Sequence, residues 1–230
     1  KNVDMYFLPQ EELKERCLRE KKIPPSKVEV SGIPISPDFS VEKNKDLLRK
    51  KWKVKENLYT VLVMGGGQGW GAIQETVLSL NKIDFPLQVI VVSGTNRKLR
   101  KNLCRLSSSL NFPFQVYGYV REIDELMEIS DLLITKPGGL TTAEALSKGL
   151  PMIVIDSITG QERRNKKMLL EKGFALAIDN TEKLREAVGF FFNNGFDKNV
   201  WKKKTRQIAR PNSSCEIVRK IMSMREKMER

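Results

Sequence analysis

Residues 59–71 read YTVLVMGGGQGWG, and this stretch decides the fold. Its first six residues form an almost unbroken apolar run, which is typical of a strand buried on both faces of a sheet. A glycine-rich segment follows at 65–71, and residues 72–80 then have the apolar spacing of a helix. A buried strand, a glycine turn and a helix in this order predict the start of a βαβ unit.

The same alternation continues along the chain. Further short apolar runs, each a predicted strand, occupy residues 88–92, 114–119, 132–135, 152–155 and 175–178. Predicted helices lie between them at residues 98–110, 123–129, 141–148 and 165–172. The pattern predicts an α/β fold in which a Rossmann-like parallel sheet carries helices on both faces.

The segments outside this alternation suggest a division into four regions. Residues 4–8, 11–21 and 28–30 predict strand, helix and strand, and the proline- and glycine-containing residues 31–37 mark an interdomain crossing. Because the chain begins at Lys1 without a methionine, we expect it to be the back part of a longer protein. The predicted regions are 1–40 as the remnant of a preceding domain with its junction, 41–58 as a connector, 59–195 as the Rossmann-like domain and 196–230 as basic C-terminal helices.

The charge of the chain is concentrated near its C-terminus. The 230 residues carry 41 Lys plus Arg against 28 Asp plus Glu, a net charge of +13. The cluster Lys202, Lys203, Lys204 and Arg206 contributes strongly, and we expect it to dock on an anionic membrane surface. A solvated helical face is the alternative. Beyond this cluster, Ser213 and Glu216 have the spacing of a capping box that starts a terminal helix.

Composition also excludes several kinds of chemistry. The chain has no histidine, which excludes the Ser/His/Asp and Cys/His nucleophile systems and the histidine zinc motifs. The three cysteines, Cys17, Cys104 and Cys215, have no metal-binding spacing, so we expect no metal and a reduced intracellular compartment. No apolar stretch is long enough to span a bilayer.

Three segments carry candidate binding residues, and the first is the glycine loop at 65–71. Glycines between a strand and a helix bring backbone N–H groups close to a ligand, which suits a pyrophosphate. A nicotinamide dinucleotide is less favoured, because residues 93–95 at the end of the next strand contain no ribose-binding carboxylate. A tight turn without a ligand is the remaining alternative.

The second segment, TKPGGLTTAE at 135–144, repeats the order of strand, glycine turn and helix. Helix starts at the carboxyl ends of parallel strands point to one crevice, where open α/β sheets bind ligands. Glu144 could accept both hydroxyls of a ribose. Alternatively, Thr141 and Glu144 form a capping box and the glutamate only satisfies backbone donors.

The third segment, GQERRN at 160–165, follows the predicted strand 152–155. Its Gln161, Glu162 and Asn165 offer donors and acceptors that fit the hydroxyls of a sugar. A capping box between Thr159 and Glu162 is again the alternative for the glutamate, although it does not explain Gln161.

Together these motifs resemble a known family. The order GGGQGWG, TKPGGLTTAE, GQERRN and PNSS before a terminal helix is similar to the donor-binding, C-terminal half of the inverting GT-B glycosyltransferases of family 28. Within that family the chain most resembles the diacylglycerol glycosyltransferases, and residues 30–34 resemble the junction between their two domains.

The resemblance implies a role for each candidate residue. It assigns to the donor Gly66, Gly67, Gln68, Tyr119, Val120, Lys136, Gly138, Gly139, Leu140, Thr141, Glu144, Gln161, Glu162 and Asn165. The first three face the diphosphate, the next two hold the uracil, and the lysine with the glycine turn meets phosphate. Glu144 then grips the ribose, and the last three residues read the hexose.

The implied reaction is transfer of a hexose from UDP-glucose or UDP-galactose to a diacylglycerol-type lipid, with inversion and without a cofactor. The general base is expected in the missing N-terminal domain, against which the C-terminal helices would pack, so this fragment alone should catalyse little. The resemblance also implies that the protein is cytoplasmic and is attached peripherally to the cytoplasmic face of a membrane. Two alternatives stay open. One is the N-acetylglucosaminyltransferase of lipid-linked peptidoglycan precursors; the other, a basic domain that binds RNA or a protein, is disfavoured because aromatic residues are only 7% and no RNA-binding signature appears.

Overall fold

The computed structural model describes residues 3–155, 160–193 and 196–228. Within them, a six-stranded sheet of order β5-β4-β3-β6-β7-β8 forms the centre of the molecule, and all of its strand pairs are parallel. Its strands are β3 (Tyr59–Met64), β4 (Leu87–Val92), β5 (Phe114–Tyr117), β6 (Leu132–Thr135), β7 (Met152–Ile155) and β8 (Leu176–Ile178). The predicted α/β fold is therefore confirmed.

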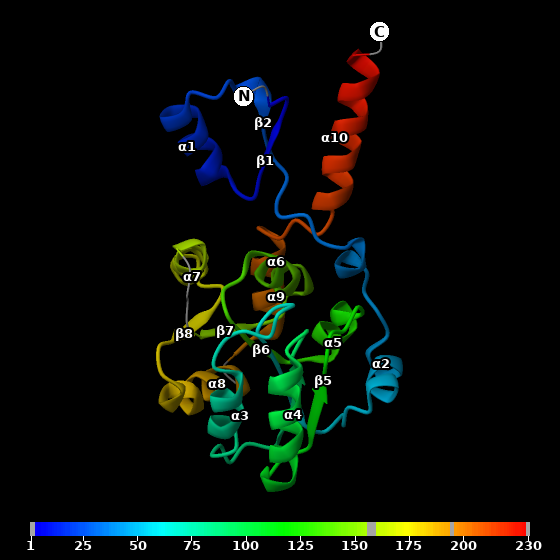
Figure 1. Ribbon diagram of the computed structural model, residues 1–230, viewed down its shortest axis with the longest axis vertical. Coiled ribbons are helices and arrows are strands. Elements are labelled where there is room, and N and C mark those ends of the chain that lie inside the picture. Colours follow the sequence, from blue (N-terminus) through cyan, green and yellow to red (C-terminus); the bar gives the residue numbers. More distant parts are fainter. Residues whose placement is uncertain (1–2, 156–159, 194–195, 229–230) are drawn as a thin grey trace.

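Helices cover both faces of this sheet (Figure 1). One face carries α3 (Ile73–Leu80), α4 (Arg97–Leu106) and α8 (Leu184–Phe192), and the other carries α2 (Lys45–Trp52), α5 (Ile123–Ile129), α6 (Gly139–Lys148) and α7 (Gly160–Glu171). Strand β3 shows why the sheet needs both layers. Val61 and Val63 belong to one core, Leu62 belongs to the other, and all three are fully buried.

One helix is shorter than its pattern predicts. The helix expected at 98–110 ends at Leu106, and Ser107–Ser109 continue as a single 3-10 turn. The hydroxyls of Ser107 and Ser109 each donate to a carbonyl three residues back, at 2.8 Å. Serine hydroxyls compete in this way with the regular helical bonding, so a serine run ends the helix early.

Residues 3–30 form a small unit beside the C-terminal helix (Figure 1), whereas Ile35 and Phe39 already belong to the core of the sheet domain. Strands β1 (Tyr6–Leu8) and β2 (Val28–Val30) pair in parallel, and α1 (Glu11–Lys21) connects them, as the sequence predicts. Helix α10 (Ser213–Met228) extends next to this unit, and Lys220 on it forms an ion pair with Glu29 of β2 at 2.7 Å.

Two chain segments pass side by side between this unit and the sheet. The hydroxyl of Ser213 donates to the carbonyl of Ile33 at 2.7 Å, and that of Ser214 donates to Ile35 at 2.5 Å. The expected capping box is therefore wrong: the N–H of Glu216 donates to the carbonyl of Asn212 at 3.0 Å instead. The hydroxyl of Ser213 thus bonds to the neighbouring segment at Ile33 and does not cap its own helix.

Helix α9 (Lys198–Arg206) packs on the Rossmann-like domain itself. Trp201 is 9% exposed and makes ring contacts with Phe174, Phe191 and Phe196. The sequence grouped this helix with residues 196–230, whereas its core contacts lie with the sheet domain. The packing of the C-terminal helices against an acceptor domain stays a prediction.

Candidate functional site

The three candidate segments lie at one edge of the sheet. The glycine loop follows β3, the TKPGG turn follows β6 and the GQERRN helix follows β7, and β3, β6 and β7 are consecutive neighbours in the sheet. The chain places β4 and β5 on one side of β3 and the later strands on the other side. Ligands of open α/β sheets bind at this kind of switch point, beyond the carboxyl ends of the strands.

The glycine loop is held by the loop that follows β4. The N–H of Thr95 donates to the carbonyl of Gly67 at 2.9 Å, and the side-chain amide of Asn96 donates to the carbonyl of Gly69 at 3.3 Å. A Cβ at Gly94 would lie 2.2 Å from the carbonyl oxygen of Gly67, so only glycine permits this approach. A Cβ at Gly67 would meet nothing within 4 Å, which leaves that side of the loop open.

Helix α6 begins at Gly139, two residues before its predicted start, with Gly138 as its N-cap. The alternative of a capping box between Thr141 and Glu144 is therefore wrong, because both residues lie inside the helix. In the part of the chain that the structure describes, the N–H groups of Gly139, Leu140 and Thr141 have no backbone hydrogen bond. Free amides at a helix start attract phosphate.

Glu144 lies in the second turn of α6 and is half-buried. Burial, followed by the negative charge of Asp124, raises the pKa of its carboxyl from 4.5 to about 7. Asp124 belongs to α5 and forms an ion pair with Lys43 at 2.6 Å. Glu144 itself has no hydrogen bond or ion pair with the described residues, so its oxygens are available to a ligand such as a ribose diol.

Side-chain contacts join the three segments. The Nζ of Lys136 lies 2.8 Å from the Oε1 of Glu162, and the lysine Cε lies 3.6 Å from a Cβ built at Gly66. The amide of Asn165 donates to the carbonyl of Pro137 at 3.0 Å. Residues that follow β3, β6 and β7 thus lie close to one another at the carboxyl edge of the sheet.

The remaining candidates lie around this centre. Gln161 is exposed at the start of α7, whereas Thr159 lies outside the described residues. The loop after β5 lies close to the loop after β4, which holds the glycine loop: a Cβ at Gly118 would lie 3.8 Å from the carbonyl oxygen of Gly94. In that loop Tyr119 is 66% exposed, and Val120 packs against the core.

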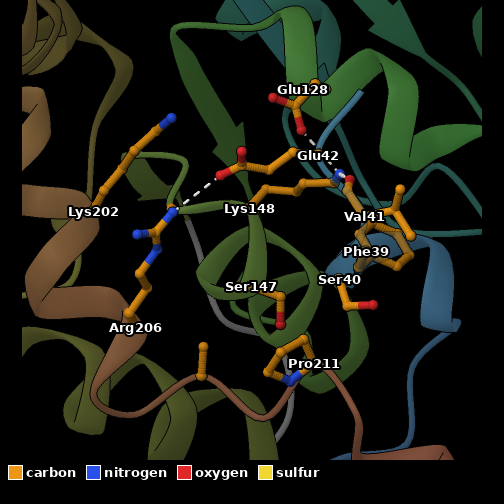
Figure 2. Close-up of a pocket in the computed structure, with 12 residues that line it drawn as sticks. Phe39, Ser40, Val41, Glu42, Glu128, Ser147, Lys148, Lys202, Arg206 and Pro211 are labelled. Atoms are coloured by element: carbon orange, nitrogen blue, oxygen red, sulfur yellow. Dashed lines mark hydrogen bonds and ion pairs between the residues drawn. The ribbon is translucent and has the colours of Figure 1, made fainter. Parts of the chain in front are cut away.

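The candidate membrane-docking cations are spread around α9 and lie apart from this crevice. Figure 2 shows Lys202 and Arg206 lining a separate cavity of about 160 Å³, where Arg206 forms an ion pair with Glu42 at 3.0 Å. Lys204 lies over the ring of Phe174, 5.1 Å from its centroid, and Lys203 is exposed. These cations therefore do not form a single flat patch.

Sequence reasoning missed two groups of residues near the site. Asp124 affects Glu144 from another helix, and no sequence spacing connects the two. Trp70, Thr95 and Asn96 line a cavity beside the glycine loop. The sequence does carry a signal for Thr95 and Asn96, since both follow a buried strand that ends at the same edge of the sheet.

The arrangement suits an anionic ligand with several hydroxyl groups. Free helix amides and Lys136 provide positive potential for phosphate, and Glu144, Glu162 and Asn165 provide acceptors and donors for sugars. Among the described residues, no group of three or more metal-ligating side chains is found, and no helix is long and apolar enough to cross a membrane.

Comparisons with known proteins agree with this geometry. Residues 60–207 match the model of the glycosyltransferase family 28 C-terminal domain. The chain is 34% identical to a processive diacylglycerol beta-glucosyltransferase of Bacillus subtilis (strain 168), covering 99% of this chain and 59% of the relative. It is also 34% identical to a probable chloroplastic monogalactosyldiacylglycerol synthase of Nicotiana tabacum, covering 95% of this chain and 42% of the relative. The chain thus spans little more than half the length of the first relative and less than half the length of the second.

Solved structures share the fold. The UDP-GlcNAc 2-epimerase of Neisseria meningitidis superposes with a TM-score of 0.70 at 21% identity, covering 96% of this chain and 61% of the other. MurG of Acinetobacter baumannii superposes with a TM-score of 0.66 at 21% identity, covering 86% and 58%. The six-stranded sheet with its helices is therefore the C-terminal half of a GT-B architecture, as the motifs predicted.

Proposed function

Because the chain belongs to glycosyltransferase family 28, whose C-terminal domain it contains, we propose that it binds UDP-glucose or UDP-galactose and serves to transfer the hexose to a diacylglycerol-type lipid. The names of its relatives, a processive diacylglycerol beta-glucosyltransferase and a probable monogalactosyldiacylglycerol synthase, support this choice of hexose and acceptor. The activity of a whole enzyme is part of the proposal, since this chain covers 59% of the first relative and 42% of the second.

The observation that carries the proposal is the contact between Lys136 and Glu162 beside Gly66. The Nζ and Oε1 atoms are 2.8 Å apart, and the glutamate is only 8% exposed. This pair joins the segment proposed for the diphosphate to the segment proposed for the hexose. A ligand that contains both groups in sequence, as a nucleotide sugar does, would contact both partners at once.

The proposed chemistry is a single displacement with inversion. The oxygen of the acceptor hydroxyl forms a bond to the anomeric carbon while the bond from that carbon to the diphosphate oxygen breaks. The electron pair leaves with UDP, and the hydroxyl proton passes to a general base that we do not assign to a residue. The first turn of α6 and Lys136 stabilise the charge that develops on the departing diphosphate.

Glu144 supplies the independent support for a nucleotide. A half-buried carboxyl with a pKa raised to about 7 and no partner among the described residues is costly for a fold to keep. Two hydroxyls of a ribose would donate to its two oxygens and stabilise its ionised form. We place the uracil against the loop after β5, where Val120 packs against the core and Tyr119 is exposed.

Calorimetric titration of the chain tests the proposal. The ligands are UDP, UDP-glucose, UDP-galactose, UDP-N-acetylglucosamine and NAD, and the titrations are repeated on Glu144→Ala. We expect UDP and one UDP-hexose to bind the wild-type chain, and the variant to lose this binding. Preference for UDP-N-acetylglucosamine would shift the assignment to the peptidoglycan precursor enzyme, and the absence of any uridine nucleotide binding by a folded chain would refute the proposal.

A further inference from the structure

An open cavity of about 440 Å³ lies on the β4 side of the glycine loop, and Gln68 is the one lining residue that it shares with the residues assigned to the donor. Its lining residues are Gln68, Gly69, Trp70, Gly71, Thr95 and Asn96. None of these side chains is charged, although 30% of the chain is. The lining therefore suits a neutral, polar ligand better than a phosphate or a cation.

Trp70 is the distinctive residue of this cavity because its side chain is largely exposed. It is 57% exposed, whereas Trp201 is 9% exposed and Trp52 donates its indole N–H to Glu125 at 2.8 Å. An exposed indole gives a flat apolar surface with a polar edge. The C–H face of a pyranose ring fits against such a surface, and its hydroxyls remain free to bond with neighbouring polar groups.

Some polar side chains around Trp70 already make hydrogen bonds within the protein, and others are available to a ligand. Asn96 is occupied: its amide N–H donates to Gly69 at 3.3 Å, and its amide oxygen accepts from the N–H of Leu99 at 2.9 Å. The amide of Gln68 and the hydroxyl of Thr95 are exposed and make no hydrogen bond with the described residues. They can both donate and accept, as recognition of sugar hydroxyls requires.

The cavity lies on the other side of the glycine loop from the proposed diphosphate position. Lys136 approaches Gly66 from the β6 side, at 3.6 Å from a Cβ built there. The cavity is lined instead by the loop after β4, which bonds to Gly67 from the opposite side. A ligand in the cavity would therefore lie next to the donor without overlapping it.

We propose that this cavity binds a pyranose ring carried by the acceptor lipid, and that Trp70 is the specificity-determining residue that favours glycosylated acceptors over unglycosylated ones. The inference rests on the proposed function, because an acceptor is defined only beside a donor. Thr95 orients the ring through its hydroxyls, and the indole selects a sugar over a bare glycerol, which has no such face.

Nuclear magnetic resonance of the chain tests this inference with methyl β-D-glucopyranoside at millimolar concentrations as the probe. The three tryptophans give three indole N–H signals, of which Trp52 and Trp201 serve as internal controls. We expect only the Trp70 signal to shift and to saturate. Because these variants lack the Trp70 indole, their binding is followed on the signals of the glucoside itself: Trp70→Ala should weaken binding roughly tenfold, and Trp70→Phe should retain part of it. Leu47→Ala, which truncates a residue that is 65% exposed on α2, should change nothing.

Repeating the titration with saturating UDP-glucose separates the acceptor sugar from the donor sugar. Persistence of the Trp70 shift supports the inference, and competition by UDP-glucose overturns it. If the chain binds UDP but the Trp70 signal does not shift with the glucoside, this inference alone is overturned. The same holds if the Trp70 signal shifts only when vesicles of phosphatidylglycerol are added. A Trp70 response without UDP binding overturns the proposed function and still supports a sugar cavity.

Discussion

At the scale of single residues, Glu144 combines a cost to stability with a proposed role in binding. Its pKa is raised from 4.5 to about 7, so the folded chain releases this proton at higher pH than the unfolded chain does. Between these two values the unfolded state ionises first, and folding becomes less favourable as the pH rises. Its contribution to stability is complete below about pH 4.5 and is lost as the pH passes about 7.

Glu144→Gln should therefore stabilise the chain more at pH 8 than at pH 5. A neutral amide has no proton to lose, and the difference between the two pH values should be on the order of 2 kcal/mol in the free energy of unfolding. Urea denaturation at both pH values measures it. Glu75→Gln, which removes an exposed carboxylate from α3, is the matched control. Equal effects of Glu144→Gln at pH 5 and pH 8 would contradict the assigned pKa.

Lys136 offers a second prediction at this scale. Lys136→Met keeps most of the length of the side chain but removes the charge that we place against the diphosphate, so the affinity for UDP should fall roughly tenfold or more. The affinity for uridine, which has no phosphate, should change little. Calorimetry for UDP and chemical-shift titration for uridine measure the two, and Lys203→Met on α9 is the control. A parallel loss for both ligands would mean that the lysine supports the fold of the crevice instead.

At the scale of elements, the crossing between the N-terminal unit and the sheet depends on close backbone contact. Gly32 has a φ of +87°, and a Cβ there would lie 2.5 Å from the Cβ of Arg210. Both the backbone conformation and the space therefore require glycine at this position.

Gly32→Ala should destabilise the chain by about 1–3 kcal/mol, because the substitution strains the backbone and pushes the two crossing segments apart. Gly67→Ala is the matched control, since a Cβ at Gly67 would meet nothing within 4 Å. Thermal and urea unfolding of both variants measure the difference. An unchanged stability of Gly32→Ala would show that the two segments separate freely.

The start of α6 is the element that matters most for the site. Its sequence permits two N-termini, at Gly139 or at the Thr141 capping box, and local preferences favour the second. The structure has the first, with Gly138 as the cap and the Thr142 hydroxyl donating to its carbonyl at 2.9 Å. The earlier start places Glu144 in the second turn and leaves the N–H groups of the first three helical residues without a hydrogen bond to the described residues. A shift of two residues thus changes the role of the glutamate and of these amides.

At the scale of the whole molecule, the basic residues of α9 are proposed to dock the protein on an anionic membrane. Changing Lys202, Lys203, Lys204 and Arg206 together to Gln should weaken binding to phosphatidylglycerol vesicles, most clearly at low salt, because about 1 kcal/mol is expected from each cation near such a surface. Vesicle sedimentation at two salt concentrations measures this loss.

The control for that variant removes equal charge from another surface. Lys82, Lys98, Lys101 and Arg105 are exposed on α4 or just after α3, and changing them to Gln should affect vesicle binding less. Similar losses in the two variants would mean that net charge, rather than α9, drives binding. Arg206 is paired with Glu42 at 3.0 Å, so its share should be the smallest of the four.

The amino-acid sequence by itself determined the layers of this molecule. The predicted bounds of β3, β6, β7 and α5 agree with the structure to the residue, because each is an apolar run or a periodic helix that ends at a glycine or a polar residue. Burial on two faces is a local property that every strand carries in its own residues. The carboxyl-edge location of the three motifs followed from the same pattern.

Only the tertiary structure decided which side chains meet. The contact between Lys136 and Glu162, the charge of Asp124 near Glu144, and the cavity beside Trp70 each join residues from different strands or helices. Such contacts depend on the order of strands in the sheet and on the residue at which each helix begins. Hydrophobic periodicity predicts neither of the two. The sequence thus specified the elements and the edge, and the packing of those elements specified the chemistry of the site.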